Sequence, residues 1–152
     1  MNTEMQIVNV QTDDLPALLA LYRQLHPSDP APEGAELAGV WADILADPNY
    51  HILLAKQDGR IAASVTVIVV KNLTRGARPY AIVENVITDS AYRKRGLASA
   101  LIAEAVKIAQ AADCYKVSLT TGNKDGGTFY FYESCGFNRA DKTAFIRWLG
   151  KP

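Results

Sequence analysis

The spacing of apolar residues in the first third of the chain predicts a short strand and two helices. The strand runs from Gln6 to Val10, and Thr12 is placed to cap the first helix, with Pro16 tolerated in its first turn. Apolar side chains then recur at helical intervals, at Leu15, Leu18, Leu19, Tyr22 and Leu25. The proline-rich stretch 26–32 ends that helix, and a second amphipathic helix carries Leu37, Val40, Trp41, Ile44 and Leu45.

The middle of the chain predicts an antiparallel meander. Three β-rich stretches, at Tyr50–Lys56, Ile61–Lys71 and Tyr80–Thr88, follow one another with short connections. The first connection contains Asp58-Gly59, a dipeptide typical of tight hairpins, and the second is the polar loop 72–79.

The last third alternates helices with strands. A helix is predicted to open near Gly96, a strand to span residues 115–121, and a further helix to span residues 128–134, with Gly136 as its left-handed end. The chain is then predicted to return to strand from Phe137 onward, including Ala144 to Leu149. No repeat or linker interrupts this order, so we expect one mixed α/β domain over residues 1–152.

Composition narrows the function classes. Sixteen Lys and Arg balance sixteen Asp and Glu, which argues against a general nucleic-acid binder. Two cysteines, with no C-x-x-C pair, give neither a disulfide scaffold nor a metal site. The longest apolar stretch, 61–70, is short of the ~20 residues that a membrane helix needs, and no signal peptide is evident. We therefore expect a cytoplasmic protein without a metal, a nucleic-acid partner or a membrane partner.

The segment Arg93-Lys94-Arg95-Gly96-Leu97-Ala98-Ser99 joins the strand 80–88 to the following helix. The first N–H groups of a helix lack intrahelical partners, so small residues and cations at this point favour an anion site. The alternative is an ordinary helix start with solvated basic side chains. Neither a Walker loop nor the G-x-G-x-x-G dinucleotide pattern is present.

Arg93-x-x-Gly96-x-Ala98 resembles the Q/R-x-x-G-x-G/A motif of the GNAT superfamily of acetyl-CoA-dependent N-acetyltransferases. A second block, Phe131-Tyr132-Glu133-Ser134-Cys135-Gly136-Phe137, is similar to a segment near the end of many members. The resemblance implies a single-domain α/β fold. Its central sheet is mixed and mostly antiparallel, opens in a V-shaped splay and carries helices on both faces.

The resemblance also implies an acetyl-CoA site. The pantetheine arm would pair with the strand backbone at Val86, Ile87 and Thr88, and the strand 116–121 would form the other wall. The pyrophosphate would sit at the turn, formed by Arg93, Lys94, Arg95, Gly96, Leu97, Ala98 and Ser99. Asn123 resembles an asparagine that contacts the coenzyme arm in the family. An equally good interpretation is that Asn123 only forms a turn.

Two catalytic candidates follow from the same resemblance. Tyr132 would donate a proton to the leaving thiolate, with a core aromatic as the alternative role and Tyr130 as the alternative donor. Glu84 would act as the base, directly or through water; an ion pair or a solvated strand residue is the competing interpretation. The segment Val83-Glu84-Asn85-Val86-Ile87 is similar to that of glucosamine-6-phosphate N-acetyltransferases, as is Asp113-Cys114-Tyr115-Lys116-Val117.

The acceptor is the least constrained partner. A small-molecule primary amine is favoured, with a protein amine or a catalytically silent coenzyme-binding module as alternatives. Acidic residues of the first two helices favour a cationic amine, whereas Arg75 and Arg78 suit a phosphate or carboxylate. Cys114 and Cys135 are interpreted as buried structural thiols. Both a monomer and a homodimer remain open.

Overall fold

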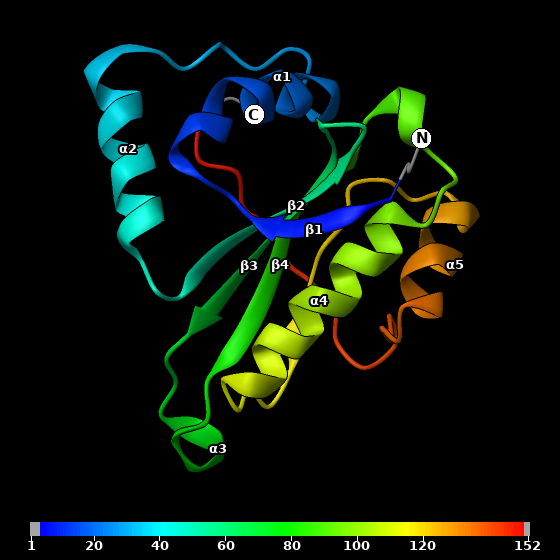
Figure 1. Ribbon diagram of the computed structural model, residues 1–152. Helices are drawn as coiled ribbons and strands as arrows, with labels where there is room; N and C mark the ends of the chain where they lie inside the picture. The colour runs from blue at the N-terminus through cyan, green and yellow to red at the C-terminus, as the bar shows by residue number, and fades with distance from the viewer. Residues whose placement is uncertain (1–3, 151–152) are drawn as a thin grey trace. The chain divides into compact units, whose positions relative to one another are not determined.

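The computed structural model describes residues 4–150, which divide after Leu119 into two compact units. The first unit contains a sheet in the order β1-β2-β3-β4-β5 (Figure 1). The strands are β1 Gln6–Asn9, β2 Tyr50–Gln57, β3 Arg60–Val70, β4 Tyr80–Thr88 and β5 Val117–Ser118. The helices of this unit are α1 Leu15–Leu25, α2 Gly34–Ala46, α3 Thr74–Ala77 and α4 Leu97–Ala111.

The strands β1 to β4 pair antiparallel in chain order, as the hydropathy pattern predicts. Asp58 and Gly59 both have positive φ, 54° and 73°, which confirms the expected tight hairpin between β2 and β3. β5 is parallel to β4 but pairs only at Ala81 and Ile82. The strand predicted over residues 115–121 is therefore much shorter than its β-rich sequence suggests.

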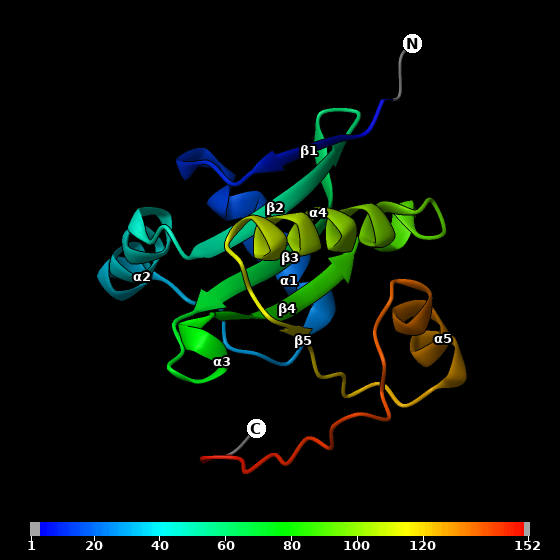
Figure 2. The ribbon, with the colours of Figure 1, turned by 90° about the horizontal axis from the view of Figure 1, so that it is seen from below.

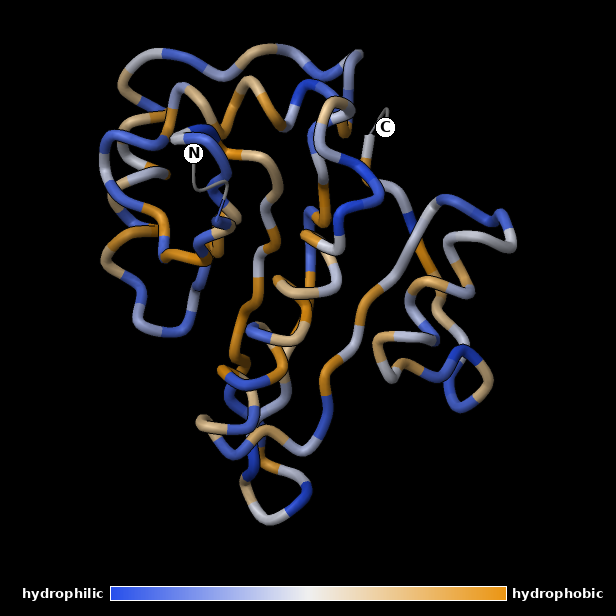
Figure 3. The backbone as a smooth tube through the Cα atoms, turned by 45° about the vertical axis from the view of Figure 1, so that its right-hand side comes forward, coloured by the Kyte–Doolittle hydropathy of each residue, from blue (hydrophilic) through white to orange (hydrophobic). Residues whose placement is uncertain are grey.

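Helices cover both faces of the sheet (Figure 2). On one face, Leu97, Leu101 and Ala105 of α4 join the buried side chains of β2, β3 and β4. On the other, Leu18 of α1 and Trp41 of α2 pack with β2. Apolar colour gathers along these strands and helices in Figure 3, whereas the connecting turns are hydrophilic. The arrangement confirms a mixed, mostly antiparallel sheet with helices on both faces.

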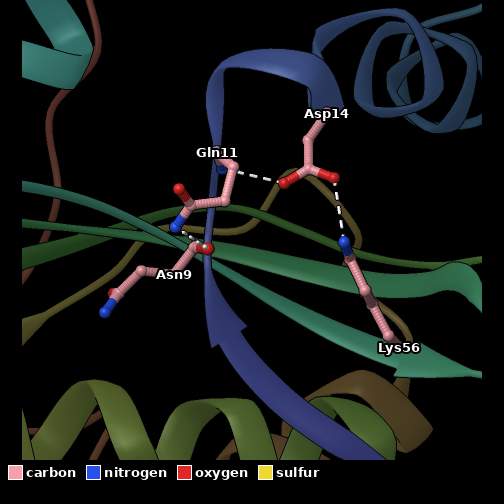
Figure 4. Close-up of polar contacts among 4 residues, drawn as sticks. All are labelled: Asn9, Gln11, Asp14 and Lys56. Carbon is pink, nitrogen blue, oxygen red and sulfur yellow. Dashed lines mark hydrogen bonds and ion pairs between the residues drawn. The ribbon is translucent and has the colours of Figure 1, made fainter.

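The start of α1 is fixed by polar contacts that the sequence did not predict (Figure 4). Gln11, not Thr12, precedes the first helical turn, and its backbone N–H donates to Asp14 Oδ2 at 2.8 Å. Lys56 Nζ of β2 donates to Asp14 Oδ1 at 2.9 Å. Partial burial raises the pKa of Asp14, but the bonds from Lys56 and Gln11 outweigh it and hold the pKa below its usual value.

The second unit contains α5, Gly126–Ser134. Asp125 caps it by accepting from Thr128 N at 2.7 Å, and Gly136 has φ 95°, so the left-handed end is confirmed. The predicted strand from Phe137 through Ala144–Leu149 is wrong, because described residues 137–150 form no strand. No helix in residues 4–150 is long and apolar enough to span a bilayer.

Candidate functional site

A bulge in β4 shapes the middle of the candidate site. Ser64 pairs with Ile87 and Thr66 pairs with Glu84, so Asn85 and Val86 together lie opposite Val65 alone. Asn85 adopts a left-handed conformation, φ 52°, which accommodates the extra residue. The bulge leaves Glu84 on the sheet face that carries Thr66, whereas Val86 packs into the core beneath α4.

Beyond Ile82, no strand of the described residues pairs with the β5 side of β4. The predicted arm-binding residues Val86, Ile87 and Thr88 lie in this stretch, and their side chains are buried or half-buried. Buried side chains and an unpaired backbone edge can occur on the same strand. The side chains point above and below the sheet, whereas the N–H and C=O groups point sideways toward a neighbouring strand. This edge suits an extended ligand with amide groups, such as the pantetheine arm.

The turn between β4 and α4 has the conformation of an anion cradle. Lys94 and Gly96 both have positive φ, 62° and 77°, and Gly96 is the residue immediately before α4. Glycine has no side chain to cap the helix, so the first N–H groups of α4, at Leu97, Ala98 and Ser99, have no side-chain partner from that position. These groups and the helix dipole favour a bound phosphate.

The three cations of the turn are not equivalent. The Arg95 guanidinium donates to Ala91 O at 3.3 Å and lies 5.0 Å from the centre of the Tyr92 ring, which fixes it on the protein. Arg93 and Lys94 are exposed. Arg93 and Lys94 are therefore the better candidates for direct contact with an anionic ligand.

A clamp that sequence reasoning missed ties α1 to this turn. Gln24 Nε2 donates to Asp89 Oδ2 at 2.9 Å, and Gln24 Oε1 accepts from Ser90 N at 3.0 Å. Asp89 Oδ1 also accepts from Ala91 N at 2.8 Å. The amide of Gln24 thereby holds the end of β4 just before residues 93–99. Only the three-dimensional pairing reveals it, since the partners are more than 60 residues apart.

The sheet face below α1 carries a group of hydroxyls that the sequence also did not single out. Ser64 and Thr66 are fully buried, and Ser64 Oγ donates to Leu53 O at 3.1 Å. Burial raises the pKa of Tyr22, and the nearby hydroxyls of Thr66 and Ser64 partly oppose that rise. Within the described residues, Tyr22 Oη and Thr66 Oγ1 are buried without a hydrogen bond of good geometry.

Glu84 and Tyr50 lie on this same face. Glu84 is exposed and lies opposite Thr66. Burial raises the pKa of Tyr50, and the negative charge of Glu84 raises it further. Tyr50 was not singled out from the sequence. The register pairs Tyr50 with Ile68 and Ile68 with Ile82, which shares a face of β4 with Glu84. A sheet face that carries a carboxylate, a phenol and alcohol groups suits a polar acceptor.

Asn123 belongs to the second unit and takes part in a turn. Its Oδ1 accepts from Asp125 N at 3.2 Å, and its backbone N–H donates to Thr121 Oγ1 at 3.1 Å. Asn123 is thus a turn residue, as the alternative interpretation predicted. A role toward the coenzyme arm stays a prediction and would use the remaining Nδ2 group.

Tyr132 and Tyr130 differ in environment. Tyr132 is half-buried, with its ring 5.1 Å from that of Phe131 and 6.3 Å from that of Phe137. Burial and, secondarily, Cys135 raise the pKa of Tyr132, which keeps the hydroxyl protonated at neutral pH. Tyr130 is 75% exposed. These differences support Tyr132 over Tyr130 as the proton donor, and the role itself stays a prediction.

The cysteines offer no competing nucleophile. Cys114 and Cys135 are free and only half-buried, whereas the sequence analysis expected buried thiols. Burial, followed by the charge of Asp113, raises the pKa of Cys114 despite the opposing effect of Arg78, which disfavours its thiolate. Residues 4–150 contain no cluster of three His, Cys, Asp or Glu side chains arranged for a metal.

Comparison with known proteins agrees with this geometry. A model of the "Acetyltransferase (GNAT) family" matches residues 15–137. The glucosamine 6-phosphate N-acetyltransferase of Trypanosoma brucei brucei is 30% identical over 91% of this chain and 92% of its own length. Glucosamine 6-phosphate N-acetyltransferase 1 of Oryza sativa subsp. japonica is 35% identical over 78% of this chain and 72% of its own length.

The fold has a counterpart among solved structures. A structure from Agrobacterium tumefaciens str. C58, to which acetyltransferase activity has been attributed, superposes with a TM-score of 0.87. It is 43% identical, and the match covers 94% of this chain and 99% of that one. Together with the family match and the two named relatives, this similarity identifies the chain as an acyltransferase, a member of the GNAT family of acetyltransferases.

Proposed function

We propose that this protein transfers the acetyl group of acetyl-CoA to the primary amine of a small molecule, with a phosphorylated amino sugar as the leading acceptor. The names of both relatives, each a glucosamine 6-phosphate N-acetyltransferase, support glucosamine 6-phosphate as the first compound to test. The polar face around Glu84 and Tyr50 supports a hydroxyl-rich acceptor over an apolar one.

The observation that carries the proposal is the turn at residues 93–99. Its left-handed Gly96 precedes a helix without a side-chain cap, and the turn directly follows a strand whose edge is open beyond Ile82. A phosphate-bearing ligand with an extended amide arm fits both features at once. A simple anion such as free phosphate would bind only at the turn and would leave the open edge of β4 without a partner.

The assigned reaction forms a bond between the acceptor nitrogen and the acetyl carbon and breaks the bond from that carbon to sulfur. Glu84, directly or through a water, takes the proton that the attacking amine must lose. A backbone N–H of β4 near Val86 stabilises negative charge on the carbonyl oxygen, because fixed donors there need no reorganisation during reaction. The strand positions both reactants and so reduces the entropy cost of their meeting.

Tyr132 is assigned the proton that the departing thiolate requires. Its raised pKa supports this role, since a phenol that stays protonated retains a proton to give. A phenylalanine at this position keeps the ring contacts with Phe131 and Phe137 but removes the proton.

Release of free coenzyme A across an amine panel tests the proposal. The panel contains glucosamine 6-phosphate, glucosamine, a polyamine and a lysine peptide, and each product is identified by mass spectrometry. Acetylation of glucosamine 6-phosphate with the highest kcat/KM is the expected result. Turnover of the peptide alone would favour a protein acetyltransferase, and acetyl-CoA binding without any turnover would favour a regulatory module.

A further inference from the structure

We propose that the hydroxyls of Tyr22 and Thr66 form a chain of hydrogen-bond donors that ends on the Glu84 carboxylate and orients it toward the acceptor amine. The inference rests on the proposed function, because it concerns the base of the same site. It assigns a positioning role to two residues that lie beneath the sheet face and do not touch the reacting atoms. Tyr22 belongs to α1, whereas Thr66 and Glu84 lie opposite each other on β3 and β4.

The register of the sheet limits the partners that Thr66 can reach. On one side Thr66 lies opposite Ile52 of β2, and on the other it lies opposite Glu84 of β4. Directly opposite residues of antiparallel strands carry their side chains on the same face, with Cβ atoms about 4.5–5.5 Å apart. The Ile52 side chain has no hydrogen-bonding group, whereas an ionised Glu84 offers two acceptor oxygens. The hydroxyl proton of Thr66 therefore has an acceptor on the β4 side.

Tyr22 reaches the same point from the helix above. α1 packs across β3 and β4, on the sheet face opposite α4 (Figure 2). Burial raises the pKa of Tyr22, and hydrogen bonding with the hydroxyls of Thr66 and, secondarily, Ser64 opposes that rise. Hydrogen bonding acts only at short range, so the phenol oxygen lies beside these two hydroxyls.

The count of protons gives the chain its direction. Each of the three hydroxyls has one proton to donate, and Ser64 Oγ already donates to Leu53 O at 3.1 Å. Within residues 4–150, Tyr22 Oη and Thr66 Oγ1 are buried without a hydrogen bond of good geometry. A buried hydroxyl is costly to leave unpaired. Donation from Tyr22 to Thr66 and from Thr66 to Glu84 uses both remaining protons, because an ionised carboxylate accepts but does not donate.

A donor at one carboxylate oxygen gives the base a defined orientation. Glu84 is exposed, whereas Thr66 is fully buried. A bond from Thr66 to one oxygen restricts the rotamers of Glu84 and leaves the other oxygen for the proton of the attacking amine. Catalytic hydrogen bonds are often poorly aligned before the substrates bind and tighten in the reacting complex. The imperfect geometry of the two buried hydroxyls fits such a chain.

Variants that remove single hydroxyls test the chain by kinetics. Thr66→Val replaces the hydroxyl with a methyl group, and Tyr22→Phe keeps the ring. We expect kcat to fall about tenfold in Thr66→Val and about threefold in Tyr22→Phe, with the KM for acetyl-CoA unchanged. Thr66→Ser keeps a donor and should restore most of kcat. Thr12→Val makes the same chemical change in the exposed first turn before α1 and should leave kcat unchanged.

A double-variant cycle shows whether Thr66 acts through Glu84. Glu84→Met keeps the length of the side chain but has no oxygen that accepts from Thr66 or takes a proton. Thr66→Val should therefore have almost no effect on the residual kcat of Glu84→Met. Ser64→Ala is the matched control, because Ser64 lies opposite Ile87 and donates to Leu53; it should change kcat by the same factor in both backgrounds. An equal loss from Thr66→Val in both backgrounds would overturn the chain.

Urea unfolding of the same variants measures the contact without turnover. The shift of the unfolding midpoint in the double variant should be smaller than the sum of the shifts from Thr66→Val and Glu84→Met, because each substitution breaks the same bond. Such non-additive shifts, without acetylation of any amine, would support the chain and overturn the proposed function. Turnover of an amine together with additive shifts would overturn the chain and leave the proposed function intact.

Discussion

Replacing Gly96 with alanine isolates the backbone conformation of the coenzyme turn. Gly96 has φ 77° and ψ 13°, and a Cβ built there meets no heavy atom within 4 Å. The substitution therefore acts through the backbone and not through a clash. A left-handed conformation costs a non-glycine residue ~1–2 kcal/mol, while restriction of the unfolded chain returns ~0.4–1 kcal/mol. We expect the free energy of unfolding to fall by about 1 kcal/mol.

Gly39 provides a matched control because its surroundings are equally open. It lies inside α2, has no positive φ, and a Cβ there also meets nothing within 4 Å. Alanine in a helix interior is better than glycine by ~0.5–1 kcal/mol, so Gly39→Ala should be stabilising. Urea unfolding measures the change in the free energy of unfolding, which should be negative for Gly96→Ala and positive for Gly39→Ala. Gly96→Ala should also raise the KM for acetyl-CoA several-fold. Equal stabilisation by both substitutions would refute the left-handed turn.

Three further predictions address other parts of the site and fold. Tyr132→Phe should lower kcat by ~10²–10⁴-fold. Because burial raises the pKa of Tyr132 above its ordinary 10.0, the wild-type rate should not fall at alkaline pH until the pH exceeds 10.0. An unchanged kcat in Tyr132→Phe would exclude Tyr132 as the acid. Gln24→Ala should raise the KM for acetyl-CoA with little loss of kcat, since it releases the turn from α1; steady-state kinetics that show no change in KM would contradict the clamp with Asp89. Asp14→Asn should lower Tm at neutral pH, because it removes the ion pair with Lys56. The folded-state pKa of Asp14 lies below 3.8, so the difference in Tm between wild type and variant should narrow as the pH falls below 3.8. A Tm difference that is constant with pH would contradict the role of this ion pair.

The parts of the fold that the sequence predicts are those set by local pattern. Asp58-Gly59 specifies its hairpin through two residues that tolerate positive φ. Gly96 and Gly136 mark one helix start and one helix end correctly, because glycine adopts conformations that other residues avoid. The residue pattern alone is therefore sufficient to locate the turn at 93–99.

The parts that the sequence misses depend on pairing between distant residues. Ala144–Leu149 has a strand-like composition, yet Phe145 and Leu149 are largely exposed and no strand forms. A strand is stabilised by its neighbours, so composition alone does not decide it. The bulge at Asn85–Val86 is a mismatch of register between β3 and β4, which no local signal marks.

The predicted site divides in the same way. The extent of a single domain over residues 1–152, the homodimer and the role of Asn123 stay predictions. Lys116 was expected at the wall of the coenzyme gap, and that role stays a prediction. Its Nζ lies 5.5 Å from the centre of the Tyr80 ring and 5.6 Å from that of Tyr115. Such distances between side chains are not contained in a linear sequence.

Backbone amide NMR during titration with coenzyme A shows which residues the coenzyme contacts. We expect the largest shift changes on residues 94–99, with a second group at residues 86–88 along the open edge of β4. Shift changes confined to other parts of the chain, such as the residues that line the hollow between α2 and β2, with residues 94–99 unaffected, would contradict this expectation.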